Sequence, residues 1–259
     1  MNDASSATPR RSVLVAGGLG YIGWATATRL AIDGHRVTVL DLAAPDRGLA
    51  AIESALQTEP ALSRVSYVQA DVTDLDRLTA AIESVDGLDT VIANAGIVTS
   101  ARFLDVTPEQ WDSQLATNLT GAFHTAQIAA RRFVADGTAG LLLFTGSWVA
   151  DVPWPEITAY VATKAGLQMV AKQAARELAV HGIRANVVAP GIVRAGLAKV
   201  QLDTEPQFAA RAAHVVPLNV LQTPQQVAGA FSFLCSADAE YMTGSTLLVD
   251  GGASLHAFD

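Results

Sequence analysis

The sequence predicts an α/β fold in which a parallel sheet is covered by helices on both faces. Three observations support this fold class. Short apolar runs alternate with longer segments of helical composition, which is the spacing of repeated βαβ units. A glycine-rich turn at residues 17–23 joins the first apolar run to the first helical segment. Polar residues such as Asp41 and Asn94 follow several apolar runs at the point where a strand would end.

The predicted strands are short and apolar, as expected for strands that are buried on both faces. They comprise residues 13–16, 36–40, 65–70, 88–93, 141–144, 184–189 and 245–249. The predicted helices comprise residues 24–33, 74–84, 107–133, 159–180 and 224–234, with Thr73 as the expected N-cap of the second. Residues 195–221 form a long, loosely patterned segment, and we predict that it is a lid over the site.

The composition allows one substantial hydrophobic core and excludes several classes of function. The chain has 259 residues, of which 50% are hydrophobic and 16% charged. We predict a single domain over residues 12–259 after a flexible polar tail, residues 1–11. A net charge of -8 argues against a nucleic-acid partner. No apolar run approaches the roughly 20 residues of a membrane span, so we expect a soluble, cytoplasmic protein.

Neither the cysteine nor the histidines predict a reactive or metal-binding site. The single cysteine, Cys235, adjoins the apolar run 227–234, so we expect it to be buried and structural. The five histidines are scattered through the sequence without the spacing of metal ligands. We therefore predict no metal cofactor.

The turn at residues 17–23 is predicted to bind the pyrophosphate of a dinucleotide. Glycines let the backbone turn tightly and approach the phosphates, whose charge then lies at the N-terminus of the following helix. Asp41 ends the second strand, 18 positions after Gly23. A carboxylate at this place bonds the adenosine ribose hydroxyls and would repel the extra phosphate of NADP. NAD is therefore the expected cofactor, and Arg47 keeps NADP open as the less favoured choice.

Further polar residues stand at the ends of other predicted strands. Asp71 follows the third strand and Asn94 follows the fourth. Ligands of parallel sheets bind in the crevice beyond the carboxyl ends of the strands. We therefore expect both residues to meet Gly17 and Asp41 around one ligand.

Tyr160 and Lys164 are four residues apart in a predicted helix and so lie on the same helix face. Ser147 lies just past the end of the fifth predicted strand. An ammonium group near a phenol favours the phenolate, so we expect the pKa of Tyr160 to fall from about 10 towards working pH. A phenol tuned in this way can give or take the proton of an alcohol or a carbonyl group.

From Val13 to Gly252 the sequence resembles the short-chain dehydrogenase/reductase family. The resemblance rests on the order and spacing of the glycine-rich turn, Asp71-Val72, Asn94-Ala95-Gly96, Asn118, Ser147, Tyr160-x-x-x-Lys164, Pro190-Gly191 and Asp250-Gly251-Gly252. It implies a Rossmann-type fold, with a doubly wound, seven-stranded parallel sheet in three αβα layers. It also implies reversible hydride transfer between a nicotinamide and a carbinol or carbonyl carbon.

The resemblance implies a role for each matching position. Tyr160 would be the general acid/base, and Lys164 would hold the nicotinamide ribose and lower the pKa of Tyr160. Ser147 would bond the substrate oxygen, and Asn118 would position a water that links Lys164 to solvent. The implied cofactor-binding residues are Gly17, Gly20, Tyr21, Ile22, Gly23, Asp41, Leu42, Asp71, Val72, Asn94, Ala95, Gly96, Tyr160, Lys164, Pro190, Gly191, Ile192 and Val193.

Three positions depart from the family pattern. Ala16 stands where a threonine commonly begins the glycine-rich motif, which removes one side-chain hydrogen bond from the turn. Tyr21 stands where the single-domain branch usually has glycine, so the glycine spacing resembles that of the extended branch. The chain is too short for the additional substrate domain of that branch, so its substrates are not carried over. Ala195 stands where a threonine often bonds the carboxamide. The backbone of Ile192 and Val193 is therefore expected to anchor the nicotinamide.

The expected reaction is the NAD-dependent interconversion of a secondary alcohol and a ketone. Two alternatives stay open: an NADPH-dependent 3-oxoacyl reductase, and a non-catalytic NAD-binding scaffold or sensor. The predicted substrate pocket is mostly apolar, which favours a neutral small-molecule substrate. Its residues are Ser147, Trp148, Val149, Trp154, Tyr160, Gly191 and Leu197.

The predicted helices at residues 107–133 and 159–180 are apolar over much of their circumference. Each of these helices lacks a clear polar face for solvent, so part of its apolar surface would stay exposed in a single protomer. We therefore predict a homotetramer or a homodimer in which these helices form the interface.

Overall fold

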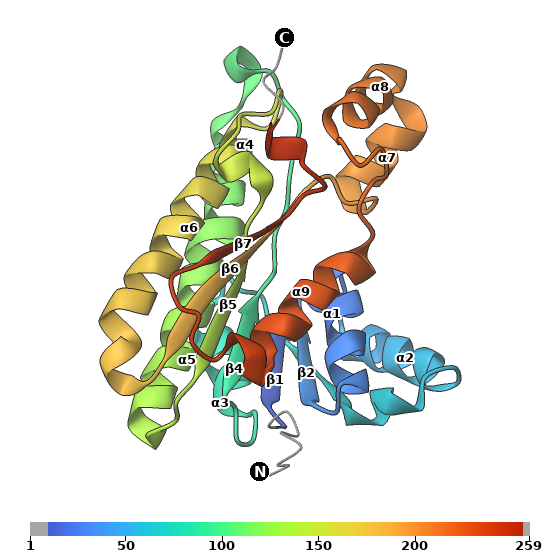
Figure 1. Ribbon diagram of the computed structural model, residues 1–259. Coiled ribbons are helices and arrows are strands. Elements are labelled where there is room, and N and C mark those ends of the chain that lie inside the picture. The colour runs from blue at the N-terminus through green and yellow to red at the C-terminus, as the bar shows by residue number, and fades with distance from the viewer. Residues whose placement is uncertain (1–9, 256–259) are drawn as a thin grey trace, which may run out of the picture.

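A seven-stranded parallel sheet forms the middle layer of the fold (Figure 1). The computed structural model describes residues 10–255, and the strand order is β3-β2-β1-β4-β5-β6-β7. All neighbouring strands pair in parallel. The order reverses between β1 and β4, which is the arrangement of a doubly wound sheet. The predicted Rossmann-type fold is thus confirmed.

The observed strands agree with the predicted ones to within a residue or two at each end. They are β1 (Ser12–Ala16), β2 (Arg36–Asp41), β3 (Val65–Gln69), β4 (Thr90–Ala93), β5 (Leu141–Thr145), β6 (Arg184–Pro190) and β7 (Thr246–Val249). The agreement has a simple cause, since a strand covered on both faces must be apolar along its whole length. Its ends are then marked by the first polar residues.

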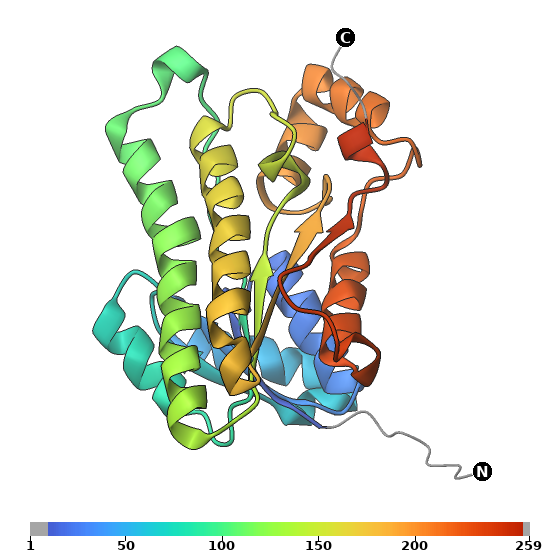
Figure 2. The same cartoon turned by 60° about the vertical axis from the view of Figure 1, so that its left-hand side comes forward.

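Successive residues of β1 anchor two different helix layers. Val13 and Val15 pack in one core cluster, and Leu14 and Ala16 pack in the other. Figures 1 and 2 show the two layers on opposite sides of the sheet. The first layer consists of α1 (Tyr21–Ile32), α2 (Pro45–Leu56) and α9 (Pro224–Cys235), and the second of α3 (Leu75–Glu83), α5 (Ala122–Asp136) and α6 (Thr158–Leu178).

The predicted helix at residues 107–133 consists of three consecutive pieces. It begins as α4 (Pro108–Gln114), continues as one stretch of π-helix, η3 (Leu115–Gly121), and ends as α5. Thr107 and Gln110 form a capping box at its start, because each side chain bonds the backbone N–H of the other residue. Asn118 lies within this π-helical stretch and is buried.

Two local predictions differ from the structure. The N-cap of α3 is Asp74, whose carboxylate accepts from the backbone N–H of Arg77 at 3.1 Å. Thr73, the predicted cap, instead donates both its backbone N–H and its hydroxyl to Asp71. Helix α2 was not predicted, and Pro45 stands at its first position, where a missing N–H costs nothing.

The predicted lid segment contains two short helices, α7 (Gly196–Thr204) and α8 (Pro206–Val215). In Figure 1 they stand beyond the carboxyl ends of the strands, apart from the two helix layers. Phe208 and Leu202 join a third apolar cluster, which also contains Trp154 and Val216. This cluster fixes the lid segment to the loop after β5.

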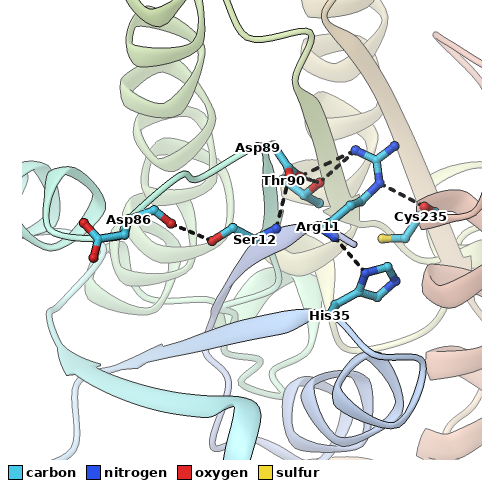
Figure 3. A network of polar contacts seen from close by, with 7 residues as sticks. All are labelled: Arg11, Ser12, His35, Asp86, Asp89, Thr90 and Cys235. Atoms are coloured by element: carbon cyan, nitrogen blue, oxygen red, sulfur yellow. Dashed lines mark hydrogen bonds and ion pairs between the residues drawn. The ribbon is translucent and has the colours of Figure 1, made fainter. Parts of the chain in front are cut away.

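A polar network ties the start of β1 to the rest of the fold at the edge opposite the lid (Figure 3). The Arg11 guanidinium donates to the carbonyl of Cys235 at 2.9 Å and lies 3.5 Å from the Asp89 carboxylate. The backbone N–H of Arg11 donates to Nδ1 of His35 at 3.0 Å. Arg11 was assigned to the flexible tail, yet these contacts anchor it, whereas residues 1–9 lie outside the described part. Cys235 is buried, as predicted.

Among residues 10–255, no group of histidine, cysteine, aspartate or glutamate side chains is arranged to hold a metal ion. The same range contains no helix that is both long enough and apolar enough to cross a membrane.

Candidate active site

A cavity of about 770 Å³ is lined by residues that follow the carboxyl ends of several strands and by residues of the lid segment. Its lining contains the glycine-rich turn, the residues that follow β2, β3 and β4, and the pair Tyr160 and Lys164. The predicted convergence of several strand ends therefore exists in the structure. The volume lies within the range of small-molecule and cofactor sites.

The glycine-rich turn leaves no room for side chains at its two ends. Gly17 has a φ of +67°, and a Cβ there would lie 2.6 Å from Cα of Ala95. A Cβ on Gly23 would lie 2.2 Å from the Gly17 carbonyl oxygen. Backbone therefore packs on backbone, and the N-terminus of α1 faces the cavity. A turn of this shape suits a pyrophosphate, which binds backbone N–H groups at a helix N-terminus.

Tyr21 shows why the departure from the family pattern is tolerated. Gly20 is the N-cap of α1 with a φ of -70°, and Tyr21 is the first helical residue. Neither position requires the left-handed conformation that favours glycine. The Tyr21 side chain is exposed at the rim of the cavity.

Asp41 stands at the end of β2 with its carboxylate at the cavity. Oδ2 accepts from the backbone N–H of Leu19 at 3.1 Å, which links the carboxylate to the glycine-rich turn. The backbone carbonyls of Asp41 and Ala43 both accept from the Tyr67 hydroxyl. Burial raises the pKa of Tyr67 and the Asp41 charge adds to the rise, so Tyr67 stays a donor. This arrangement holds one acidic side chain where a dinucleotide-binding fold bonds the adenosine ribose.

A chain of hydrogen bonds connects the glycine-rich turn to Lys164. The Asn94 amide donates to the Gly17 carbonyl at 3.1 Å and accepts from the Thr145 hydroxyl at 3.0 Å. The Lys164 ammonium donates to the Thr145 carbonyl at 2.7 Å. The three strand ends β1, β4 and β5 are thereby joined across the floor of the cavity. Thr145 was not among the predicted site residues, because one threonine at a strand end carries no sequence signal.

Asn118 lies behind the cavity lining, within the π-helical stretch. Its Oδ1 accepts from the backbone N–H of Ile97 at 2.8 Å, and its Nδ2 donates to the Ile97 carbonyl at the same distance. Nδ2 also lies 3.4 Å from the hydroxyl of Thr163, the neighbour of Lys164. Asn118 therefore fixes the segment after β4 against α6.

The pKa of Tyr160 moves in the opposite direction from the prediction. Burial of the phenol raises its pKa to about 12, and a hydrogen bond with Ser147 offsets only part of this rise. Lys164 lies close, with Nζ 5.3 Å from the centre of the Tyr160 ring, but its ammonium is directed to the Thr145 carbonyl. Desolvation therefore outweighs the neighbouring cation, and Tyr160 is a protonated donor at neutral pH.

Burial has the opposite effect on Lys164, because it disfavours the charged form of an amine. It lowers the pKa of Lys164 to about 8. The side chain is almost fully buried, and the Thr145 carbonyl is its hydrogen-bond acceptor. Lys164 therefore loses its charge within the pH range in which enzymes are commonly assayed.

Aromatic side chains form one wall of the cavity. The rings of Trp148 and Trp154 meet edge to face at a centroid distance of 5.3 Å, and those of Trp154 and Phe208 at 6.1 Å. The Arg211 guanidinium lies over the Trp154 ring at 5.7 Å. Phe208 comes from the lid segment and was not predicted as a pocket residue, since a single aromatic residue in a loosely patterned segment has no distinctive spacing.

Most of the predicted site residues line this one cavity. Gly23 and Asn118 lie behind the lining, and the side chain of Leu197 lies outside the described residues. Gln222 was missed: its Oε1 accepts from the Gly191 N–H at 3.0 Å, so it fixes the loop after β6. The predicted residues in the lining are Gly17, Gly20, Tyr21, Ile22, Asp41, Leu42, Asp71, Val72, Asn94, Ala95, Gly96, Ser147, Trp148, Val149, Trp154, Tyr160, Lys164, Pro190, Gly191, Ile192 and Val193.

Comparison with known proteins identifies the family to which this chain belongs. The family model described as enoyl-(acyl carrier protein) reductase matches residues 19–254. The 3-oxoacyl-[acyl-carrier-protein] reductase MabA of Mycobacterium tuberculosis is 36% identical, over 95% of this chain and 93% of its own length. L-rhamnose 1-dehydrogenase (NAD(P)(+)) of Azotobacter vinelandii is 37% identical, over 93% and 96%. The chain belongs to the short-chain dehydrogenase/reductase family of oxidoreductases, which bind a nicotinamide cofactor.

Solved structures agree with this assignment. The crystal structure of gox2181 has a TM-score of 0.88 at 31% identity and covers 95% of this chain and 96% of its own. Levodione reductase has a TM-score of 0.87 at 29% identity, over 95% and 98%. A 2-deoxy-D-gluconate 3-dehydrogenase from Agrobacterium tumefaciens, with bound NADP, has a TM-score of 0.85 at 27% identity, over 97% and 100%.

Proposed function

We propose that the protein is an NAD-dependent oxidoreductase that interconverts a neutral secondary alcohol and the corresponding ketone. The observation that carries the proposal is the position of Ser147, Tyr160 and Lys164 in the cavity that also contains the glycine-rich turn and Asp41. A proton donor and a cofactor-binding turn in one cavity are the two parts that a nicotinamide-dependent reaction requires.

The fit of the cavity to a dinucleotide supports the choice of cofactor. The turn at Gly17 and Gly23 has no space for side chains but leaves backbone N–H groups at the start of α1. The Asp41 carboxylate would bond ribose hydroxyls and would repel a phosphate on the same ribose, which favours NAD over NADP. When bound, the nicotinamide ring donates or accepts a hydride, and the protein supplies the proton.

Tyr160 is proposed as the proton donor and acceptor. In ketone reduction the carbonyl carbon gains a hydride and the carbonyl oxygen gains the Tyr160 proton, which gives the alcohol. The pKa of about 12 keeps Tyr160 protonated before this step. Ser147 donates a hydrogen bond to the same oxygen, which stabilises the charge that develops there. Lys164, with its lowered pKa, is a source from which Tyr160 recovers its proton.

Assay of ketone reduction, by the absorbance of the reduced nicotinamide, tests the proposal. The purified protein should oxidise NADH in the presence of neutral ketones and reduce NAD in the presence of the alcohols. Tyr160→Phe should lower turnover by about a hundredfold or more while the affinity for NADH, measured by fluorescence, stays within about twofold. Turnover by Tyr160→Phe at the wild-type rate would exclude Tyr160 as the proton donor.

A 3-oxoacyl reductase that uses NADPH is the second candidate, since MabA is a close relative in sequence. Lys164 is the one cationic side chain in the described cavity lining, and the acidic Asp41 is at the adenosine end. Both features favour a neutral substrate and NAD. Reduction of an acetoacetyl thioester with NADPH at a higher kcat/KM than any neutral ketone with NADH would support the second candidate instead.

A non-catalytic NAD-binding scaffold is the remaining alternative. Such a protein would bind NAD through the same residues but would not catalyse hydride transfer. Binding of NADH with no turnover of any alcohol or ketone by the wild-type protein would support it. The presence of Ser147, Tyr160 and Lys164 in one cavity favours the enzyme. The cytoplasmic location stays a prediction.

The oligomeric state is proposed from the outer face of α5 and α6. Figure 2 shows these two helices side by side, with no other described element in front of them. An apolar groove runs between them, lined by Leu119, Phe123, Gly166, Met169 and Val170 among others. Met169, one of the residues that line this groove, is 62% exposed in the protomer, which is a large exposure for an apolar side chain of this size. A second copy of the chain, in a homodimer or homotetramer, would cover this groove.

Light scattering at micromolar concentration measures this assembly. Met169→Lys places a charge in the groove and should shift the protein towards monomer. Val180→Lys is the matched control, because Val180 is an exposed apolar residue outside the groove. A wild-type protein that is already monomeric would exclude the proposal.

A further inference from the structure

An apolar wall borders the cavity beside Tyr160. Trp148 and Trp154 are 3% and 9% exposed. They are packed with Val216 and Ala253 in the third apolar cluster, against which Tyr160 also packs. The edge-to-face contacts with Phe208 and the Arg211 guanidinium fix the orientation of Trp154. The proton donor therefore faces a rigid aromatic surface.

A rigid aromatic wall selects for the shape of its ligand. A flexible chain loses rotational freedom when it is confined against such a surface, and this loss opposes binding. A ring has already lost this freedom and presents a flat apolar face or edge to the indoles. The wall therefore favours a cyclic substrate over an open-chain ketone of the same carbon number.

One carboxamide also belongs to the lining of this cavity. Gln201, on α7 of the lid segment, lines the cavity and is only 8% exposed. Its Nε2 donates to the Glu205 carboxylate at 3.3 Å, which orients the amide. The hydrogen bonds among the described residues include this one from Nε2 of Gln201 and none to its Oε1. A carbonyl oxygen in this state is an acceptor for a ligand group that donates, such as a hydroxyl.

The charges around Gln201 disfavour a ligand with an acidic group at this place. Apart from Lys164, which is bonded to Thr145, no described lining residue is cationic, and Glu205 lies beside Gln201. A carboxylate or phosphate near Gln201 would meet a like charge and no compensating cation.

We propose that the substrate is a neutral cyclic hydroxy-ketone, or the corresponding cyclic diol. Its ring lies against the wall formed by Trp148, Trp154 and Phe208, and its second hydroxyl donates to Oε1 of Gln201. The proposal rests on the proposed function, because it assigns the groups of the substrate that do not react. Gln201 is a specificity-determining residue of the same reaction, in which Tyr160 delivers the proton.

The test compares four ketones as substrates with NADH and with NADPH. They are cyclohexanone, 4-hydroxycyclohexanone, 2-hexanone and 5-hydroxy-2-hexanone. The wild-type protein should prefer the cyclic ketones, and among them the hydroxylated one by about tenfold in kcat/KM, as expected for one hydrogen bond to an otherwise unpaired acceptor. Gln201→Leu should reduce this hydroxyl preference to about twofold or less. The change should appear in KM for the hydroxylated ketone and not in kcat.

Gln207→Leu is the matched control. Gln207 lies on α8 of the same lid segment, is exposed and does not line the cavity, so its replacement should leave the hydroxyl preference unchanged. Thermal unfolding of each variant establishes that it is folded. Equal kcat/KM for cyclic and open-chain ketones, or an unchanged hydroxyl preference in Gln201→Leu, would overturn the inference while the proposed function stands. Absence of turnover for every ketone, with either cofactor, would overturn both.

Discussion

Lys164 loses its charge at a pH that kinetic experiments reach easily. Its pKa is lowered to about 8, whereas that of Tyr160 is raised to about 12. Between pH 6 and 10 Tyr160 therefore stays protonated, and the titrating group is Lys164. If ketone reduction needs the Lys164 cation, kcat/KM should be constant below pH 7 and fall about tenfold per pH unit above pH 8.

The pH profile of kcat/KM for a neutral ketone, measured with NADH, tests this expectation. Lys164→Arg retains a cation throughout the range, because a guanidinium does not titrate below about pH 12. The fall near pH 8 should then disappear, even where the variant is slower than the wild type. A wild-type profile that is flat from pH 7 to pH 10 would contradict the role of the Lys164 charge.

The carboxylate of Asp41 governs the choice of cofactor in our proposal. Asp41→Ser removes the charge, so NAD should bind about tenfold more weakly and the ratio of NADP to NAD efficiency should rise by a larger factor. Asp46→Ser is a suitable control, because Asp46 is a nearby acidic residue that does not line the cavity. Measurement of kcat/KM with both cofactors decides the matter. A constant ratio in Asp41→Ser would mean that Asp41 does not bond the ribose.

At the residue scale, the sequence predicted which residues form the site better than it predicted their pKa values. Tyr160 and Lys164 could be selected because their spacing places them on one helix face. The direction of the Tyr160 pKa shift could not, since it depends on burial and on the acceptor that Lys164 contacts. Thr145 and Gln201 had no signal at all. The contact of Thr145 with Asn94 links segments that are distant in sequence, and Gln201 lines the cavity only because α7 folds over it.

The close packing of the glycine-rich turn between β1 and α1 allows a prediction for Gly23. Gly23→Ala would place a methyl group 2.2 Å from the Gly17 carbonyl oxygen, so the turn must shift. We expect a loss of about 2 kcal/mol in the free energy of unfolding and a loss of NADH binding of tenfold or more. Both quantities follow from chemical denaturation and from fluorescence titration.

Gly229→Ala is the matched control for this change. Gly229 lies inside α9, where the nearest atom to an added Cβ is 4.0 Å away on Arg29. Alanine is a better helix former than glycine by about 1 kcal/mol, so this variant should be as stable as the wild type or more stable. Gly23→Ala with wild-type stability and wild-type NADH affinity would contradict the packing argument.

At the scale of elements, strands could be predicted better than helices. A doubly covered strand leaves a continuous apolar run, whereas α2 is a mostly exposed helix with few buried residues and leaves little pattern. The π-helical stretch η3 was also missed, since its composition is that of an ordinary helix. Within this stretch, Asn118 makes two hydrogen bonds with the backbone of Ile97, which join two separate segments of the chain.

At the scale of the whole molecule, the order of strands and the position of the cavity could be predicted because they follow from topology. Parallel strands joined by helices place all their carboxyl ends at one edge, so the polar residues there must meet. The two helices of residues 195–221 could not be predicted. They pack in the third apolar cluster with Trp154 and Ala253 from other parts of the chain, which no local pattern reveals.

The edge of the sheet opposite the cavity contains a buried histidine that couples stability to pH. His35 is 2% exposed, and its Nδ1 accepts from the backbone N–H of Arg11. Protonation of Nδ1 would break this hydrogen bond and place a cation beside the Arg11 guanidinium. Burial is the main cause that lowers the pKa of His35, and Arg11 lowers it further, while Asp33 and Asp89 act in the opposite direction.

A lowered pKa means that the unfolded chain binds a proton more readily than the folded protein. As the pH falls below about 6.5, the His35 contribution should therefore destabilise the fold, by up to about 1.4 kcal/mol per pH unit until the folded-state pKa is reached. His35→Asn keeps an acceptor for the Arg11 N–H but does not titrate, so it should lose less stability between pH 7 and pH 5 than the wild type. His181→Asn, at an exposed histidine, should retain the wild-type loss. Urea denaturation at the two pH values measures the difference, and an equal loss in His35→Asn and the wild type would show that another group controls the acid sensitivity.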